Sequence, residues 1–418
     1  MNMQTALGLI MLNPYNANCI IMQGARDPLR FSLASFPSRQ PKKAMSWGGL
    51  SSQTVGSTQP VASPDLKLPD TQADGISSLA FAPSETLNLV AAGSWDNSVR
   101  LWNLQEQASQ GLGMASQGPG IMATPVGEIK HQGPVLDVCM SPEGNVFSAG
   151  CDNKAMMWTP NPAGGAPQTQ QIAEHSAPIK CIAHVPQLPC IVTGSWDQTV
   201  KFWDMRQSSP AHQFQLPHKI TAMDCRYPYL CVATSNKEVY VYNLAGGIRP
   251  LKPGGAPIQS QIKAFQTRCL SMFPDCSGFA IGNIEGRVAI HYIDHRQGDK
   301  TVEFAYKCHR IDAKDTPNKT AEIYAVNSIS FHNRYGTFAT AGADGSYAFW
   351  DKDKRQRLKA PTRFNAPISC ASFNHRGDLY GYAVSYDWSK GSEHYNKQQP
   401  NDVFIHVVKE DEIKPKKK

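Results

Sequence analysis

Two twelve-residue stretches of this chain are nearly identical: GSWDNSVRLWNL begins at Gly93, and GSWDQTVKFWDM begins at Gly194. In each stretch an aspartate is followed six residues later by a tryptophan. A pattern that recurs along a chain indicates a duplicated structural unit, so this repeat limits the fold more than any other feature of the sequence. Six turns place an Asp, Asn or Glu six residues before an aromatic ring, and they start at Asp96, Asp152, Asp197, Asn236, Glu285 and Asp344.

Two runs of alternating apolar residues precede each turn, as in PIKCIAHV (178–185) and CIVTGSWD (190–197). Alternation with β-branched and aromatic residues predicts strands. A repeat of roughly 40–60 residues with this turn is typical of a propeller built from four-stranded blades. With a seventh unit at 366–408, the sequence predicts an all-β fold, a seven-bladed WD40 β-propeller over 61–410.

A ring of blades leaves a strand edge unpaired unless the ring closes. The stretch DLKLP at 65–69 stands just before the first unit. We expect it to pair with VFIHVV at 403–408 and to complete the last blade.

The polar residues of the repeat have a structural interpretation. In WD-repeat blades the turn Asp, a Ser or Thr four residues before it, an upstream His and the strand Trp form one hydrogen-bonded set. Leaving a buried polar group unpaired costs about 1–3 kcal/mol, so we interpret these residues as structural and not as catalytic dyads. The first unit has Ala92 where the hydroxyl should stand, so its set is incomplete. The predicted members are His131, Ser148, Asp152 and Trp158; His175, Thr193, Asp197 and Trp203; and Thr340 and Asp344 with Trp350.

Several function classes find no support in the motifs. The chain has no run of about 18 apolar residues, so we expect no transmembrane helix and no membrane partner. It has no G-x-x-x-x-G-K, G-x-S-x-G or H-E-x-x-H motif. The 11 cysteines form no C-x-x-C pair, and the adjacent Cys308 and His309 lack a second ligand pair. We therefore expect no catalytic residues, no metal site and no cofactor.

The segments outside the repeat are rich in Ser, Gln, Pro and Gly. We predict that 1–60 is a disordered N-terminal extension, with a basic mitochondrial presequence as the alternative. Translation could also start at Met45. We predict loops between blades at 105–127, whose role the sequence does not assign, and at 159–171. The end of the chain, 411–418, is predicted to be a basic tail, and a solvated terminus is favoured over a nuclear signal.

Basic residues gather in two segments. KDKRQRLKAPTR at 352–363 has six basic residues and one acid, and we expect it to connect the sixth blade to the seventh. YKCHR at 306–310 is expected in the connection before the sixth blade. Consecutive connections are neighbours on a propeller, so the two should merge into one patch that suits phosphates or acidic peptides. A merely solvated loop is the alternative.

Five longer blocks resemble the messenger-RNA export factors of the nuclear pore, a family of seven-bladed WD-repeat proteins. They are GSWDQTVKFWDMR, GNIEGRVAIHYI, YKCHR with the later EIYAVNSISFH, FWDKDKR and SYDWSKGSEHYN, and the resemblance covers about 65–415. A related family, the mitotic checkpoint WD-repeat proteins, shares the EGRVA block and the CHR block before the sixth unit. It lacks the WDKD and YDWSKG blocks as they stand here, which favours the export factors.

The resemblance implies a function and partners. It implies docking on an acidic segment of a phenylalanine-glycine nucleoporin, assistance to nuclear export of poly(A) mRNA, and a second role at the mitotic spindle. Checkpoint kinases or microtubule-associated factors would be the partners in that second role. The implied location is the nucleus, the nuclear pore and the nuclear envelope, with some protein in the cytoplasm. The alternative is a spindle-checkpoint adaptor that binds the same kind of segment in checkpoint kinases.

Site residues follow from the resemblance and from the basic segments. Trp95 and Trp196 are candidates for the binding face, with packing within the turn as the alternative. Trp350 belongs by position to the structural set of its blade and could support the site without touching a ligand. For the partner peptide we expect Arg287, Lys307, Trp350 and Lys352. For single-stranded RNA we expect Tyr306 as a stacking surface, with Arg310, Lys352, Lys354, Arg355 and Arg357.

Overall fold

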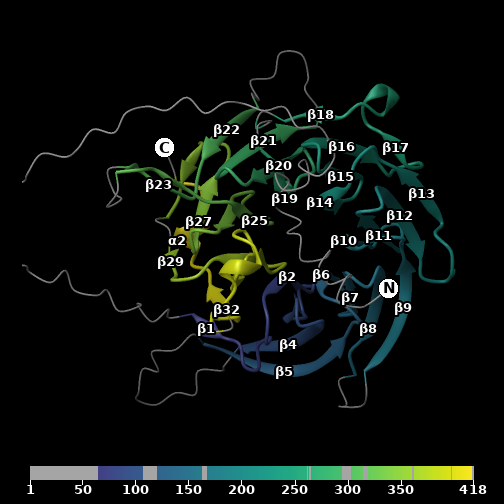
Figure 1. Ribbon diagram of the computed structural model, residues 1–418, viewed down its shortest axis with the longest axis horizontal. Helices are drawn as coiled ribbons and strands as arrows, with labels where there is room; N and C mark the ends of the chain where they lie inside the picture. Colours follow the sequence, from purple (N-terminus) through teal and green to yellow (C-terminus); the bar gives the residue numbers. More distant parts are fainter. Residues whose placement is uncertain are drawn as a thin grey trace, which may run out of the picture. The chain divides into compact units, whose positions relative to one another are not determined.

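The computed structural model describes residues 65–106, 120–161, 167–260, 262, 265–293, 303–313, 319–359, 362–396 and 398–416. Within them, antiparallel sheets of four or five strands form seven blades around a ring (Figure 1). The predicted seven-bladed propeller is confirmed. The extension predicted for 1–60 lies outside the described residues.

The first four blades follow one another along the chain, each with its innermost strand first. Blade 1 holds β2 (Ile76–Phe81), β3 (Leu89–Ser94), β4 (Ser98–Glu106) and β5 (Ile121–Lys130); blade 2 holds β6 (Val135–Met140), β7 (Val146–Gly150), β8 (Lys154–Thr159) and β9 (Gln168–Glu174); blade 3 holds β10 (Ile179–Val185), β11 (Cys190–Ser195), β12 (Thr199–Asp204) and β13 (His212–Gln215); blade 4 holds β14 (Ile220–Arg226), β15 (Tyr229–Thr234), β16 (Glu238–Asn243), β17 (Arg249–Pro250) and β18 (Ile258–Gln259).

The last three blades keep this order, except that the outermost strand of blade 7 comes from the start of the chain. Blade 5 holds β19 (Thr267–Met272), β20 (Gly278–Asn283), β21 (Arg287–Tyr292) and β22 (Phe304–Lys307); blade 6 holds β25 (Val326–Phe331), β26 (Phe338–Gly342), β27 (Ser346–Asp351), β28 (Gln356–Arg357) and β29 (Thr362–Arg363); blade 7 holds β30 (Ile368–Phe373), β31 (Leu379–Val384), β32 (Asp402–Val407) and β1 (Leu66–Lys67); a hairpin of β23 (Arg310–Ile311) and β24 (Glu322–Ile323) joins blades 5 and 6, and α2 (Glu410–Ile413) ends the fold.

Parts of two segments that we predicted as loops between blades are strand. Residues 121–127 of the first segment belong to β5, and residues 168–171 of the second belong to β9. Each strand pairs with the one before it, so these parts of the segments belong inside a blade. They were missed because these outer strands are mostly exposed, and they lack the apolar alternation by which a half-buried strand is recognised.

The core lies between neighbouring blades. The second strand of each blade is buried along almost its whole length, as in CIVTGS of β11 and GFAIGN of β20. Apolar clusters therefore join the facing sheets of adjacent blades, and each blade needs both of its neighbours to bury its two faces.

The ring closes where the sequence predicts. Leu66 pairs with Ile405 and Lys67 with Phe404, so β1 is the outermost strand of blade 7. The N–H of Leu68 also donates to the carbonyl of Val403 at 2.9 Å. Leu68 is buried in the cluster shared by blades 7 and 1, which places the closing strand in the core.

Side-chain charges reinforce this short closing strand. Nδ1 of His406 lies 2.8 Å from Oδ1 of Asp65, and Nε2 lies 2.8 Å from Oε2 of Glu412. The Tyr382 hydroxyl donates to Asp65 at 2.7 Å, and Lys359 of blade 6 pairs with Glu412. We call Asp65, His406, Glu412 and Lys359 the closure network.

The C-terminal segment is not a tail from residue 411 onward. Residues 410–413 form α2, and Ile413 is buried among the apolar residues of blades 6 and 7. The Thr337 hydroxyl donates to the carbonyl of Ile413 at 2.9 Å. The basic residues that follow were a poor guide here, because α2 docks through the buried side chain of Ile413 and through the ion pairs of Glu412.

The closure network should make the stability of the fold depend on pH. Burial lowers the pKa of His406, but the hydrogen bonds to Asp65 and Glu412 outweigh it and raise the pKa to about 9 from an ordinary 6.5. Burial raises the pKa of Glu412, yet its partners hold that pKa at about 2. The stabilisation by charged His406 is thus full below pH 6.5 and is lost as the pH rises through 9. The part due to Glu412 is full above pH 4.5 and is lost as the pH falls towards 2.

Urea unfolding of wild type and His406→Gln at about pH 6 and pH 9.5 tests this dependence. The wild type should be more stable than the variant at the lower pH, and the difference should shrink at the higher pH. His212→Gln, in an exposed position on β13, is the matched control and should change little at either pH. A difference between wild type and His406→Gln that is the same at both pH values would contradict the expected role of the charge.

Candidate partner-binding site

The hydrogen-bonded set of blade 3 is complete. His175 lies 2.9 Å from Asp197 through Nδ1 and 2.7 Å from the Thr193 hydroxyl through Nε2. Nε1–H of Trp203 donates to the same hydroxyl at 2.8 Å. Burial would raise the pKa of Asp197, but bonds from Thr199 and His175 hold it at about 2. Every polar group of the set has a partner, which fits a structural role.

Blade 2 has a shorter set. His131 contacts Asp152 at 2.9 Å and Ser148 at 2.7 Å, as expected. Trp158 does not join them, because its buried Nε1 has no hydrogen-bond partner among the described residues. In blade 1, where Ala92 replaces the hydroxyl, Trp102 donates instead to the carbonyl of Pro69 at 2.8 Å.

Blade 6 has a full set with a member that sequence reasoning missed. His309 lies 2.8 Å from Asp344 and 2.9 Å from Thr340, and Nε1–H of Trp350 donates to Thr340 at 2.9 Å. We considered His309 only as a metal ligand because the long segment 310–325 separates it from its blade. A usable signal was its place two residues after the outer strand β22, close to the place of His175 directly after β9.

The two hydroxyls of blades 2 and 3 allow a matched test of the structural reading. Thr193→Val removes a hydroxyl that serves both His175 and Trp203, and it should lower the free energy of unfolding by about 1–3 kcal/mol. Ser148→Ala removes a hydroxyl that serves His131 without a tryptophan and should cost less. Urea unfolding measures both. Equal costs for the two variants would contradict the assigned hydrogen-bond pattern.

The basic residues meet on the outer edge of blades 5 and 6. Arg287 of β21 and Lys307 of β22 are direct partners in the antiparallel ladder. Side chains in such a pair lie on the same face about 5 Å apart, and two like charges there repel each other. An anion placed between them would relieve the repulsion. The sequence analysis expected both residues in the peptide-binding site but did not predict that they pair directly.

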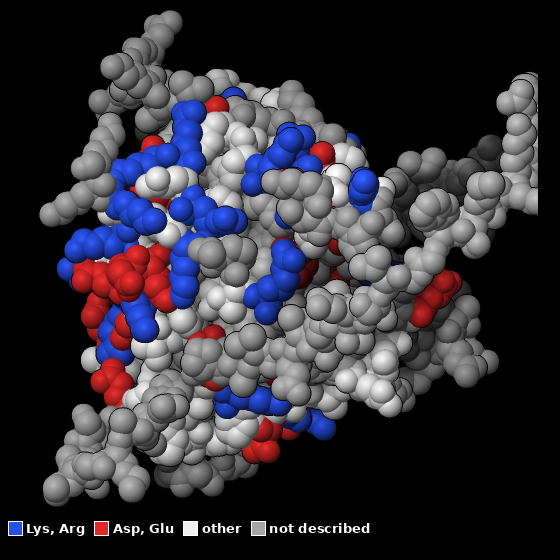
Figure 2. All heavy atoms as spheres, turned by 90° about the vertical axis from the view of Figure 1, so that its left-hand side faces the viewer, with Lys and Arg blue, Asp and Glu red and all other residues white. Residues whose placement is uncertain are grey.

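A cavity of about 240 Å³ adjoins this pair. Both basic segments contribute to it, so the predicted merging of the segments into one site is found in the structure. Figure 2 shows this side of the ring, where Lys and Arg side chains gather around a smaller acidic group. The lining includes Lys307, Arg310, Asp344, Trp350, Arg357 and Arg363. We call this cavity with Arg287 the basic site.

The described part of 352–363 lies within blade 6 and does not connect it to blade 7, since 356–357 and 362–363 form its two outer strands. YKCHR is divided: Tyr306 and Lys307 end β22 of blade 5, and Arg310 begins the hairpin that joins blades 5 and 6, as predicted for this segment. Gly286 makes the approach possible, because its φ is +62° and a Cβ there would lie 2.7 Å from the carbonyl oxygen of Cys308. The outer strands of blade 6 were missed because they are too short and too charged to show a strand pattern.

Comparison with known proteins places the chain in a family. The family model "WD domain, G-beta repeat" matches residues 66–103, 123–159 and 167–204. The chain is 39% identical over 375 residues to the poly(A)+ RNA export protein of Schizosaccharomyces pombe, which covers 89% of this chain and 98% of the relative. It is 42% identical over 363 residues to the mRNA export factor of Xenopus tropicalis, covering 85% and 92%. The chain belongs to the family of WD-repeat mRNA export factors. The resemblance on which the site residues were chosen is thereby confirmed.

Two residues that we assigned to ligand binding lie differently. Lys352 is 9% exposed, and its ammonium pairs with Asp353 at 2.7 Å and lies 5.1 Å from the Phe273 ring. The ring of Tyr306 packs 5.1 Å from that of Trp350, and its hydroxyl is buried, so it does not present an open stacking surface. Both side chains turn inward because the apolar cluster between blades 5 and 6 accommodates them.

Of the other predicted basic residues, one is fixed by a hydrogen bond and three are exposed. Arg310 donates to the carbonyl of Glu285 at 2.7 Å and so fixes the turn between β20 and β21. Lys354, Arg355 and Arg357 are exposed, and Arg355 lies 4.2 Å above the Phe304 ring. Trp350 serves both its hydrogen-bonded set and the cavity wall.

The two turn tryptophans are not equivalent. Trp95 packs against Trp388, with ring centroids 5.3 Å apart, which supports packing for that residue. Trp196 is half-buried, and its backbone N–H donates to the carbonyl of Pro178 at 3.0 Å, as the backbone N–H of Trp95 does to the carbonyl of Gly75 at 2.9 Å.

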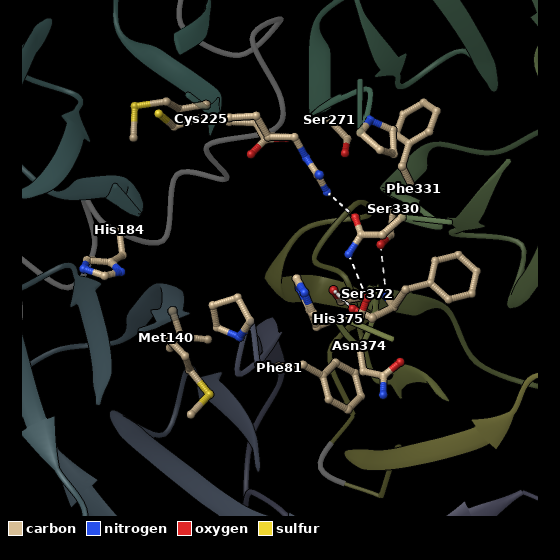
Figure 3. A pocket seen from close by; sticks show the side chains of 18 of the residues that line it. Phe81, Met140, His184, Cys225, Ser271, Ser330, Phe331, Ser372, Asn374 and His375 are labelled. Atoms are coloured by element: carbon tan, nitrogen blue, oxygen red, sulfur yellow. Dashed lines mark hydrogen bonds between the residues drawn. The ribbon is translucent and has the colours of Figure 1, made fainter. Parts of the chain in front are cut away.

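A larger cavity, about 730 Å³, lies where the innermost strands of all seven blades converge (Figure 3). Asp137 and Asp224 line it, and each accepts a backbone N–H of the next blade, from Ile182 at 2.9 Å and Met272 at 2.7 Å. Burial raises the pKa of both carboxyls. None of the predicted site residues lines this cavity, and its carboxylates join blades.

Among the described residues, no group of His, Cys, Asp or Glu has the arrangement of a metal site. No described helix is long and apolar enough to cross a membrane.

Proposed function

We propose that this protein is a non-enzymatic adaptor in the nuclear export of poly(A) mRNA. The basic site would hold an acidic peptide segment of a phenylalanine-glycine nucleoporin, which would place the protein at the nuclear pore. The main observation in support is the direct pairing of Arg287 with Lys307 in the β-ladder, beside a cavity lined by further cations. The names of the relatives support export as the process.

The geometry favours a peptide over a small molecule. The cations belong to two blades. The cavity between them has a volume of only about 240 Å³, and its lining extends from Lys307 to Arg363 along the chain. Trp350 adds an apolar wall beside the charges. An extended acidic segment could place carboxylates at Arg287 and Lys307 and lay an apolar side chain against that wall.

A titration calorimetry experiment tests the partner. A nucleoporin acidic segment is titrated into wild type, Arg287→Glu and Lys307→Glu. Each variant should bind at least tenfold more weakly, about 1.4 kcal/mol, because a charge pair at the centre of an interface is more valuable than one at its rim. Arg249→Glu, an exposed position on β17 of blade 4, is the control and should bind as the wild type does. Wild-type affinity in both site variants would reject this face.

Direct binding of single-stranded RNA is a second proposed activity. The exposed cations Lys354, Arg355 and Arg357 form a continuous basic edge. Such an edge neutralises phosphates and releases counterions, so binding should be weak and should fall steeply with salt. Lys352 and Tyr306 no longer belong in this proposal because of their burial.

Fluorescence anisotropy with a labelled oligouridylate tests the RNA activity. Replacing Lys354, Arg355 and Arg357 by Glu should weaken binding at low salt by tenfold or more and should flatten the salt dependence. Replacing Arg249 and Lys252 by Glu, on blade 4, controls for the loss of positive charge elsewhere on the ring. Binding that does not depend on salt, or that survives the triple change, would exclude this surface.

A role in the mitotic spindle, through checkpoint kinases or microtubule-associated factors, rests on the family resemblance. The same basic site would serve a kinase segment of similar acidity. Titration of a checkpoint-kinase segment beside the nucleoporin segment decides which partner the site prefers.

A further inference from the structure

One carboxylate already occupies the basic site. Oε2 of Glu285 lies 3.3 Å from Nε of Arg287, and Oε1 lies 3.5 Å from Nη2 of Arg310. The Glu285 side chain is 22% exposed, so it is neither a solvated charge nor a core residue. A single acid therefore contacts one member of the ladder pair, Arg287, and the neighbouring Arg310.

The contact of Glu285 with Arg287 is incomplete as a hydrogen bond. Nε of Arg287 is buried and has no hydrogen-bond partner among the described residues, although the carboxylate is close. A buried donor without a partner is costly, and it would gain from an acceptor in better geometry. The arginine is thus charge-compensated but still able to bind.

Lys307 has no comparable compensation. In the described part of the chain, no ion pair joins its ammonium to a carboxylate, and its side chain is exposed beside Arg287. The free protein therefore presents one compensated and one uncompensated cation in the same ladder pair.

The backbone keeps Glu285 in place. The buried side chain of Asn283 accepts the N–H groups of Glu285 and Arg287, both at 3.1 Å. Arg310 donates to the Glu285 carbonyl, as described above. The turn is thereby fixed, and the carboxylate can leave the arginines only by side-chain rotation.

We propose that Glu285 is an internal competitor for the cations of the basic site. A ligand with one carboxylate would pair with Lys307 and leave Glu285 in place. A ligand with adjacent carboxylates would also displace Glu285 from Arg287, and it would satisfy the buried Nε–H. Displacing Glu285 costs free energy, so Glu285 would lower the affinity of the site for clustered acidic residues more than for single ones. This inference rests on the peptide-binding site proposed above.

The test uses a fluorescein-labelled octaglutamate peptide and one with a single Glu among seven Ser. Glu285→Gln removes the competing charge at nearly constant shape. It should bind octaglutamate at least about threefold more tightly than wild type, which is about 0.7 kcal/mol. The gain should be smaller for the peptide with one Glu, because that peptide pairs with Lys307 and leaves Glu285 in place in the wild type. In the Arg287→Gln background the gain should also be smaller, because only Arg310 is then released from Glu285.

Glu128→Gln is the matched control. Glu128 also lies between two cations, 3.4 Å from Arg100 and 3.6 Å from Lys130, on the distant blade 1. Its substitution changes the net charge equally and should leave the affinity unchanged. Glu285→Asp keeps the charge and should not bind more tightly than wild type, and thermal unfolding checks the fold of each variant.

The outcomes separate this inference from the proposed partner. Unchanged or weaker octaglutamate binding in a folded Glu285→Gln protein would overturn the inference, since Glu285 would then only orient the arginines. An equal gain in Glu128→Gln would overturn it as well, because a general charge effect would explain it. If a nucleoporin segment fails to bind while the Glu285→Gln gain is seen, the nucleoporin proposal falls and the competitor role stands.

Discussion

The closing strand is the constraint on which the rest of this propeller depends. In the described chain Leu66 and Lys67 pair with β32, and Leu68 adds one backbone hydrogen bond to Val403, so a very short strand closes a ring whose core lies between blades. The closure network strengthens it with buried charges. Asp65 comes from the start of the described chain, His406 from the last strand and Glu412 from the terminal helix. A buried pair that loses one partner leaves an uncompensated charge, so the network makes opening of the ring costly.

The same network reaches the basic site. Lys359, which pairs with Glu412, lies between the two outer strands of blade 6 that carry Arg357 and Arg363. The contact between Lys359 and Glu412 therefore links the closure network to the segment of blade 6 that carries the cations of the basic site. A propeller suits such a site because its outer strands are covered on one side only, and charged side chains can extend from them without disturbing the inter-blade core.

Local sequence patterns were sufficient to predict the role of a residue that acts within its own repeat. The offset from Asp197 to Trp203 identified a complete set, because its members are close in sequence and each has a fixed position in the blade. The same reasoning missed His309, which joins its set from the far side of a long segment. It also wrongly predicted that Lys352 is available for ligand binding, because its ammonium lies by the ring of Phe273. Charge in a sequence does not reveal whether a side chain points to water or to a neighbouring aromatic ring.

The sequence by itself determined the seven blades, the closing strand and the two basic segments. Repeats, alternation and turn residues are local, and they are written in the chain in the order in which the blades form. Only the tertiary structure decided that Arg287 faces Lys307, that Tyr306 packs inward and that Glu285 lies against Arg287 and Arg310. Those contacts depend on strand register and on the approach of one blade to the next, and neither is encoded in the spacing of residues along the chain.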